Sequence, residues 1–277
     1  MSTNLVSMSI HSVSMKGKRN ANEDKHTTIV NFDSSNKDWA NSAPINYYAV
    51  YDGHGGKFVS KFLNDHLPSC FLDKRVEYPL KKTFVKQVYE YWQNMLKTQH
   101  LKNAANTGST CLVVIHYKHE NSEYLNILNT GDSRAMICRN NIGISLTKDH
   151  KPDWPEEYAR IKALGGDIVW DGFDFRIKDL SVSRAFGDIN AEPFLTCIPD
   201  IYRYKITSDD KFIVLACDGL WDVFNCQDVA NFILKNCFDI TNNTRINKHI
   251  NIAKRLGELA IAKGSTDNIT IIIVFFG

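Results

Sequence analysis

The sequence has no apolar run long enough to cross a membrane and no marked excess of charge of either sign. Its longest apolar run, IIIVFF at 271–276, is far shorter than the roughly 20 residues of a membrane-spanning helix. The amino terminus lacks the apolar core of a signal peptide, and Ser2 stands where N-myristoylation requires glycine. The 33 basic and 31 acidic residues leave a net charge of +2, unlike the basic surface typical of nucleic-acid binders. We therefore expect no membrane insertion and no nucleic-acid partner.

The sequence also lacks any C-x-x-C pair, although it contains 7 cysteines. Several of them lie inside apolar runs such as STCLVV and VLACDG. An odd number of cysteines in such surroundings favours buried, reduced thiols over a disulfide framework or a zinc site. We therefore expect an intracellular protein, cytoplasmic or nuclear, in which the Asn-x-Thr sequons at Asn242 and Asn268 are chance matches.

Internal repeats, low-complexity tracts and linkers rich in proline, glycine or serine are missing as well. A chain of 277 residues can bury about 75% of its unfolded surface as one large domain. With 43% hydrophobic and 23% charged residues, its composition is that of an ordinary globular protein. We expect one domain over residues 1–277, acting as a monomer.

Runs rich in Val, Ile, Tyr and Phe predict β-strands. They lie at 45–51, 110–117, 123–130, 134–139, 212–217 and 269–276. Short polar turns, KHENS and TGDS, join the runs at 110–117, 123–130 and 134–146, which favours consecutive antiparallel hairpins. We therefore expect a mostly antiparallel sheet.

Apolar residues at three- and four-residue spacing predict helices. They lie at 57–67, at 80–97, from Pro155 to the sequence LGG, at 226–236 with Asn225 as cap, and at 247–263. Each helix has a single apolar stripe that must be buried, and sheets are the surface available to bury it. The pattern predicts an α+β layered sandwich.

Four carboxylates stand at the ends of four apolar strands: Asp52, Asp132, Asp218 and Asp267. Aspartate is common in turns, so each one alone is unremarkable, but four together with Glu23-Asp24 and Asp222 predict a shared site. Crowded carboxylates repel one another unless a cation lies between them. An all-oxygen donor set suits Mg²⁺ or Mn²⁺ better than zinc, and two such ions suit hydrolysis of a phosphate ester.

The chain resembles the metal-dependent serine/threonine protein phosphatases of type 2C through nine motifs in the order of that family. They are RNANED (19–24), VYDGHGG (50–56), GST (108–110), NTGDSRA (129–135), LTKDHKP (146–152), SVSRAFGD (181–188), IPDI (198–201), LACDGLWDV (215–223) and GSTDNIT (264–270). The resemblance runs from about 16 to 276. It implies a four-layer αββα sandwich, in which two central antiparallel β-sheets are flanked by helices.

The resemblance also implies a metal centre with two Mg²⁺ or Mn²⁺ ions. Asp52 would bridge them, the carbonyl of Gly53 and, through waters, Glu23 would complete one ion, and Asp218 and Asp267 would hold the other. Two further positions, Asp132 and Asp222, match residues linked in the family to a third, weaker ion.

Two side chains of this predicted site would act on the substrate, a phosphoprotein. Arg19 matches the residue that binds the phosphate, a role that suits the paired N–H groups of a guanidinium. His54 matches a position beside the metals, where a group that titrates near neutrality can donate a proton to a poor alkoxide leaving group. The glycines after it, Gly55 and Gly56, are expected to permit positive φ or close backbone approach, and they do not form a P-loop.

Three functions remain open. The first is an active phosphoserine/phosphothreonine phosphatase, and the second is a catalytically silent relative that binds phosphoproteins or inhibits a partner, for which a ligand is usually missing. The third is a serine hydrolase, because GDSRA around Ser133 loosely resembles a nucleophile elbow, although the residues after Ser133 read as a strand rather than a helix.

Residues 150–190 match the region where the family has a mobile flap beside the site. Where many relatives have a glycine before the SVSRAFGD run, this chain has Lys178-Asp179. This region is thought to influence which substrates the family accepts, so the resemblance does not carry the substrate choice of its members over to this chain. The roles of Arg184 and Asp188 stay open, structural roles included.

Overall fold

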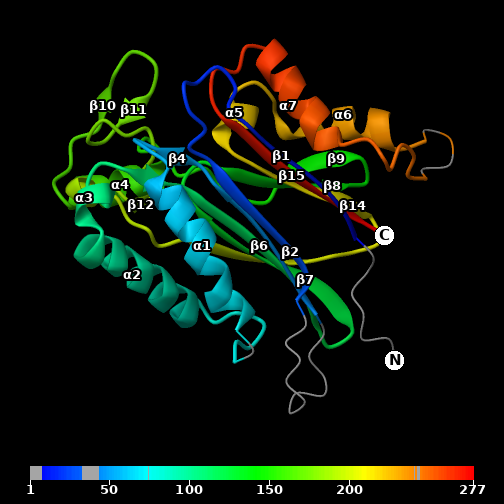
Figure 1. Cartoon of the computed structure of the whole chain (residues 1–277), viewed down its shortest axis with the longest axis horizontal. Helices are drawn as coiled ribbons and strands as arrows, with labels where there is room; N and C mark the ends of the chain where they lie inside the picture. Colours follow the sequence, from blue (N-terminus) through cyan, green and yellow to red (C-terminus); the bar gives the residue numbers. More distant parts are fainter. Residues whose placement is uncertain (1–7, 33–43, 74, 240, 242–243) are drawn as a thin grey trace.

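Two five-stranded antiparallel sheets lie face to face, and helices cover their outer faces (Figure 1). This computed structural model describes residues 8–32, 44–73, 75–239, 241 and 244–277. The first sheet has the order β13 (Asp200–Lys205), β7 (Ser122–Thr130), β6 (Cys111–His119), β3 (Ile45–Tyr51) and β2 (Lys25–Phe32). The second has the order β1 (Met8–Met15), β15 (Ile269–Phe276), β14 (Asp210–Ala216), β8 (Arg134–Arg139) and β9 (Ile142–Ser145).

The interior strand β3 is buried on both faces, which explains why its sequence is apolar or aromatic at every position except Asn46. Tyr48 and Val50 pack against residues of the second sheet such as Leu215. Tyr47, Ala49 and Tyr51 point the other way and pack against helices α1 (Phe58–Leu72) and α2 (Lys82–Gln99). One strand thus contributes to two cores, as the two-residue period of a strand requires.

The outer face of the second sheet is covered by α6 (Cys226–Cys237) and α7 (Ile252–Ala262), which pack on β14 and β15. The predicted cap is confirmed, since the side chain of Asn225 accepts a hydrogen bond from the N–H of Asp228 in a capping box. Helices on both outer faces complete the predicted αββα sandwich. None of the helices in the described part of the chain is long and apolar enough to span a membrane.

One predicted connection is wrong. KHENS does form a hairpin between β6 and β7, with His119 opposite Ser122, but TGDS does not join two strands of one sheet. The chain crosses there from β7 in the first sheet to β8 in the second, which places the turn between the two sheets. The predicted strand 134–146 is also divided into β8 and β9 by a turn at Asn140 and Asn141, both with positive φ.

A third, small sheet of two-residue strands lies beside the large ones, in the order β12 (Phe186–Gly187), β5 (Gly108–Ser109) and β4 (Gly53–His54). Residues 150–198 form helix α4 (Pro155–Ala163) and the hairpin of β10 (Val169–Trp170) and β11 (Phe175–Arg176), with a hydrophobic cluster of their own around Ile161 and Leu195. The remaining helices are short: α3 (Leu101–Ala104), the 3₁₀ helix η1 (Ile189–Ala191) and α5 (Asp218–Trp221).

Candidate active site

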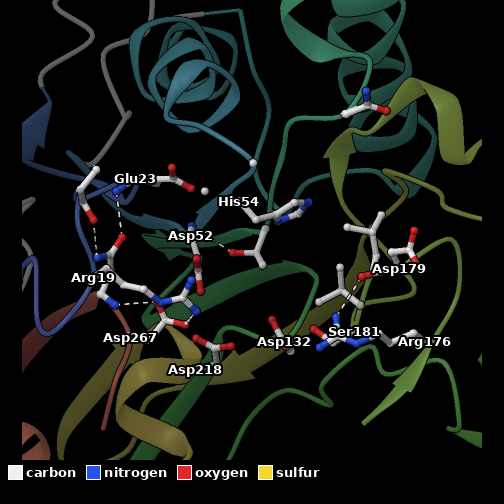
Figure 2. Close-up of a pocket in the computed structure, with 18 of the residues that line it drawn as sticks. Arg19, Glu23, Asp52, His54, Asp132, Arg176, Asp179, Ser181, Asp218 and Asp267 are labelled. Carbon is white, nitrogen blue, oxygen red and sulfur yellow. Dashed lines mark hydrogen bonds and ion pairs between the residues drawn. The ribbon is translucent and has the colours of Figure 1, made fainter. Parts of the chain in front are cut away.

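A cavity of about 580 Å³ opens where the ends of both large sheets meet the small one. Figure 2 shows Asp52, Asp218 and Asp267 gathered on one side of it, with Arg176, Asp179 and Ser181 on the other. Of the predicted site residues, the lining includes Arg19, Glu23, Asp52, Gly53, His54, Asp132, Asp218 and Asp267. Asp222 is not among the described lining residues and lies at the end of α5.

Strand directions explain why carboxylates from distant parts of the sequence meet here. Both β3 and β7 pair antiparallel with β6, so Asp52 and Asp132 leave the first sheet at the same edge. In the second sheet Ala216 pairs with Ile271, so the end of β14 lies beside the start of β15 and brings Asp218 close to Asp267. The carboxylates therefore come from both sheets rather than from four neighbouring strands of one.

The most crowded part of the cavity contains Asp52 and Asp218. Their carboxylate oxygens and the thiol of Cys217 lie within 4.8 Å of one another. The pKa of Asp52 is raised well above its usual range, mainly by burial and next by the charge of Asp218. The pKa of Asp218 is also raised well above its usual range, mainly by burial and next by the charge of Asp132. Such a site favours a cation, which would hold both groups ionised.

The donor set fits a hard ion such as Mg²⁺ or Mn²⁺. Cys217 does not change that conclusion, because burial raises the pKa of its thiol well above the usual range. Its sulfur also accepts a hydrogen bond from the N–H of Thr270 at 3.1 Å and donates one to the carbonyl of Asn268 at 3.4 Å. A neutral thiol held by the backbone is a poor ligand.

Close backbone packing around Gly53 brings its strand against the loop that carries Glu23. A Cβ on Gly53 would lie 2.5 Å from the carbonyl oxygen of Glu23, so no other residue fits. The Glu23 carboxylate accepts a hydrogen bond from the N–H of Gly56 at 3.1 Å. The predicted positive φ of Gly55 and Gly56 is confirmed, at 68° and 136°.

Arg19 stands at the mouth of the cavity, with 59% of its side chain exposed. Its guanidinium donates to the carboxylate of Asp267 at 2.5 Å. Its loop is held by Asn268, whose amide donates to the carbonyls of Lys16 and Ala21 and accepts from the N–H of Glu23. Sequence reasoning missed this role of Asn268, although its place directly after Asp267 in GSTDNIT was a signal.

A lysine that the sequence analysis did not single out occupies the neighbourhood of Asp132. The ammonium of Lys151 donates to Oδ2 of the buried Asp132 at 2.5 Å. Burial disfavours its charge, but Asp132 outweighs burial and raises the pKa of Lys151. Burial raises the pKa of Asp222, whereas the charge of Lys151 lowers it. An internal cation therefore already balances part of this acidic group.

The two residues with open roles have different surroundings. Asp188 accepts a hydrogen bond from Nε2 of His54 at 2.6 Å. Burial lowers the pKa of His54, but the hydrogen bond and charge of Asp188 outweigh it, and the net shift is upward. Arg184 lies outside the cavity lining, where it pairs with Glu157 and Asp200. Its contacts are structural.

The structure gives no support to a nucleophilic Ser133. Its side chain is fully buried, shares a hydrogen bond with the hydroxyl of Thr110 at 2.8 Å, and precedes strand β8 rather than a helix. Thr110 in turn accepts from the N–H of Asp52 at 3.1 Å. Ser133 therefore supports the strand end that carries Asp52 and lacks the exposed position of a nucleophile elbow.

A family model described as Protein phosphatase 2C matches residues 8–269. The chain belongs to the protein phosphatase 2C family. It is 34% identical to the integrin-linked kinase-associated serine/threonine phosphatase 2C of Mus musculus, over 95% of this chain and 71% of that protein. It is 33% identical to probable protein phosphatase 2C 71 of Arabidopsis thaliana, over 95% of this chain but only 54% of that protein. A PP2C-like domain-containing protein of Acanthamoeba polyphaga mimivirus is 42% identical over 56% of this chain and 95% of its own length.

Solved structures of other proteins share the fold. The serine-threonine phosphatase 2C from Toxoplasma gondii superposes with a TM-score of 0.80 at 23% identity, over 97% of this chain and 94% of that one. A C. elegans sex determining protein superposes with the same TM-score of 0.80, over 98% of this chain and 64% of that one. As a member of this metal-dependent family, the protein is a phosphoprotein phosphatase of the serine/threonine class.

Proposed function

We propose that this protein phosphatase 2C hydrolyses phosphoserine and phosphothreonine in proteins at a centre of two Mg²⁺ or Mn²⁺ ions, with His54 as general acid. The observation that carries the proposal is the meeting of Asp52, Asp218 and Asp267 from both sheets in one cavity. The raised pKa values of Asp52 and Asp218 support it, because burial and neighbouring carboxylates disfavour the ionised forms that a bound cation would favour. When bound, the ions supply an activated water and neutralise phosphate oxygens.

Each ligand would bind a particular ion of the proposed metal centre. Asp52 would bridge both ions, the carbonyl of Gly53 and, through waters, Glu23 would complete one, and Asp218 with Asp267 would hold the other. A third, weaker ion would use Asp132 and Asp222. Since Lys151 donates to Asp132 at 2.5 Å, that ion would have to displace an ammonium, which supports its being the weakest of the three.

Arg19 would hold the substrate phosphate. Its guanidinium is exposed at the cavity mouth and donates to Asp267 at 2.5 Å, so a phosphate that enters the cavity comes within reach of the same N–H groups. A planar guanidinium can bind two phosphate oxygens at once. The charge would hold the phosphate in place while its ester oxygen faces His54.

The substrates would be phosphoproteins that reach the cavity past the segment 150–190, which we propose is a flap-like part of a single catalytic domain. Arg176, Asp179 and Ser181 of this segment line the cavity, and the aromatic residues Trp170 and Phe173 of its hairpin are exposed. Its Lys178-Asp179 turn has positive φ at both residues, 51° and 68°, a conformation that explains why a glycine is favoured at such a turn. All 7 cysteines are free, which supports the proposed cytoplasmic or nuclear location.

The test is release of inorganic phosphate from a phosphothreonine peptide. We expect activity with Mn²⁺ or Mg²⁺, none in excess chelator and none for Asp218→Asn. Calorimetric titration of Mn²⁺ shows whether the ions bind and which concentration saturates the site, so that an active enzyme can be told from a catalytically silent relative. A protein that binds the phosphopeptide without turnover in saturating Mn²⁺ would be the catalytically silent relative, and full activity in chelator would exclude the metal centre.

A further inference from the structure

The small three-stranded sheet of β12, β5 and β4 brings together two polar side chains that are distant in the sequence. Its central strand β5 pairs with β4 on one side and β12 on the other, so that Gly108 lies opposite both His54 and Gly187. Asp188 directly follows β12. His54 and Asp188 are 134 residues apart in the sequence, and this sheet places them on either side of Gly108.

The contact between them is short and shielded from solvent. Nε2 of His54 lies 2.6 Å from Oδ2 of Asp188, whose side chain is only 3% exposed, whereas 28% of the His54 side chain is exposed. No residue in the described part of the chain hydrogen-bonds to Nδ1 of His54, and the histidine lines the cavity. One ring nitrogen is therefore held by a buried carboxylate while the other is left for the substrate.

Gly108 is the residue that makes room for this pair. A Cβ at position 108 would lie 1.9 Å from Oδ2 of Asp188 and 2.4 Å from Nε2 of His54. No real Cβ approaches other atoms so closely, so any side chain here would push the two groups apart. The space that a side chain at position 108 would need is occupied by the hydrogen-bonded side chains of His54 and Asp188.

The backbone of Asp188 is held firmly in an uncommon conformation. Its φ is 45°, in the left-handed region that few non-glycine residues adopt. Its N–H donates to the carbonyl of Thr107 at 3.0 Å, and its carbonyl accepts from the N–H of Ala191 at 2.7 Å. The amide of Gln93 from α2 closes the free edge of β12 by bonding both the N–H and the carbonyl of Gly187.

From this geometry we infer that Asp188 is a positioning residue for the general acid: it fixes the ring orientation and the tautomer of His54. The inference rests on the proposed function and deepens it. A buried carboxylate that accepts from one nitrogen of a histidine does this in other hydrolases. Here the proton passes from Nδ1 to the seryl or threonyl oxygen as the phosphorus–oxygen bond breaks. His54 is left neutral, with Nε2–H still bonded to Asp188.

The test is how Asp188→Asn changes the dependence of rate on the leaving group. We expect kcat for a phosphothreonine peptide to fall by about 10- to 100-fold, which is at most the lower end of the roughly 10²- to 10⁴-fold contribution of general acid catalysis. 4-Nitrophenyl phosphate, whose leaving group needs no proton, should lose less than about threefold on the same grounds. Mn²⁺ affinity by calorimetry should be unchanged. His54→Gln should show the same selectivity, and the double variant should be no slower than His54→Gln alone.

The matched control is Asp200→Asn, because Asp200 is paired with another histidine, His150, at 3.3 Å outside the cavity lining. It should lower the melting temperature without changing the ratio of the two rates. Gly108→Ala keeps both side chains but separates them, and should reproduce the selectivity of Asp188→Asn if that variant folds poorly.

The possible failures are distinguishable. If His54→Gln is selective but Asp188→Asn slows both substrates equally, or if the double variant is slower by the product of the single effects, the inference is wrong and the acid role stands. If His54→Gln itself slows both substrates equally, the acid role fails and the inference with it.

Discussion

At the scale of single residues, the buried aspartates Asp52 and Asp218 of the site differ from buried Asp210 in the charges that surround them. Buried Asp210 is neutralised by Arg139, whose guanidinium donates to it at 2.9 and 3.0 Å. Asp52 and Asp218 are buried beside other carboxylates, which raises the pKa of each. A buried aspartate therefore stabilises the fold at Asp210, where an arginine pairs with it, and destabilises the fold at Asp52 and Asp218 until a cation binds.

This contrast predicts opposite effects of the same substitution. In protein freed of metal by chelation, Asp218→Asn should raise the melting temperature by roughly 2–4 °C, or about 1 kcal/mol, because it removes one of several repelling charges. Asp210→Asn should lower the melting temperature, because it leaves Arg139 without its carboxylate. Scanning calorimetry in chelator measures both, and a lower melting temperature for Asp218→Asn would contradict the account of crowded charges.

At the scale of elements, charged side chains join helix α4 to strand β13 through Arg184. Glu157 of α4 accepts from Arg184 at 2.6 Å and from Arg160 at 2.8 Å, and Arg184 also donates to Asp200 of β13. Glu157 is almost fully buried. Burial disfavours its charge, but the two arginines prevail and lower the pKa of Glu157 to about 2.

The lowered pKa predicts a particular loss of stability in acid. A carboxylate whose folded pKa lies below its unfolded value of 4.5 stabilises the fold above that pH, and loses its contribution as the pH falls from 4.5 towards 2. Glu157→Gln should destabilise the protein by about 2 kcal/mol at pH 7, and the difference from wild type should shrink through this window. Urea unfolding at several pH values tests it, and a difference that does not change with pH would contradict the network.

The elements also show how far the sequence could predict the structure. Strands buried on both faces, such as β3 and β15, are apolar or aromatic except at Asn46 and Thr270, and were predicted within a residue or two. The edge strands β1, β2 and β13 were missed, since polar residues such as those of SIHSVS and DIYRYK weaken the pattern. The TGDS turn resembled a hairpin because local spacing carries no information about which sheet the next strand joins.

The same limit applies to the candidate site. Asp52 and Asp218 could be proposed because each ends an apolar strand and stands in a family motif. The partnership of His54 with Asp188 could not, because 134 residues separate them and only the pairing of three two-residue strands joins them. Lys151 was missed for a similar reason: its contact with Asp132 depends on how the chain crosses between the sheets.

At the scale of the whole molecule, the proposed metal centre would join the two layers, since Asp52 ends a strand of the first sheet while Asp218 and Asp267 flank strands of the second. Metal binding should therefore stabilise the fold globally rather than order a loop. Free Mn²⁺ at 100 times its dissociation constant should add about 2.7 kcal/mol to the free energy of unfolding, and raise the melting temperature by roughly 5–10 °C. Hydrogen exchange should slow at the ends of both β3 and β14.

Asp52→Asn should abolish both the added stability and the slower exchange. The control is Asn225→Ala, which removes the α6 cap far from the ligands. It should lower stability by about 1 kcal/mol and keep the full metal-dependent increase. An increase that survives in Asp52→Asn would show that the ions do not bridge the sheets at this residue.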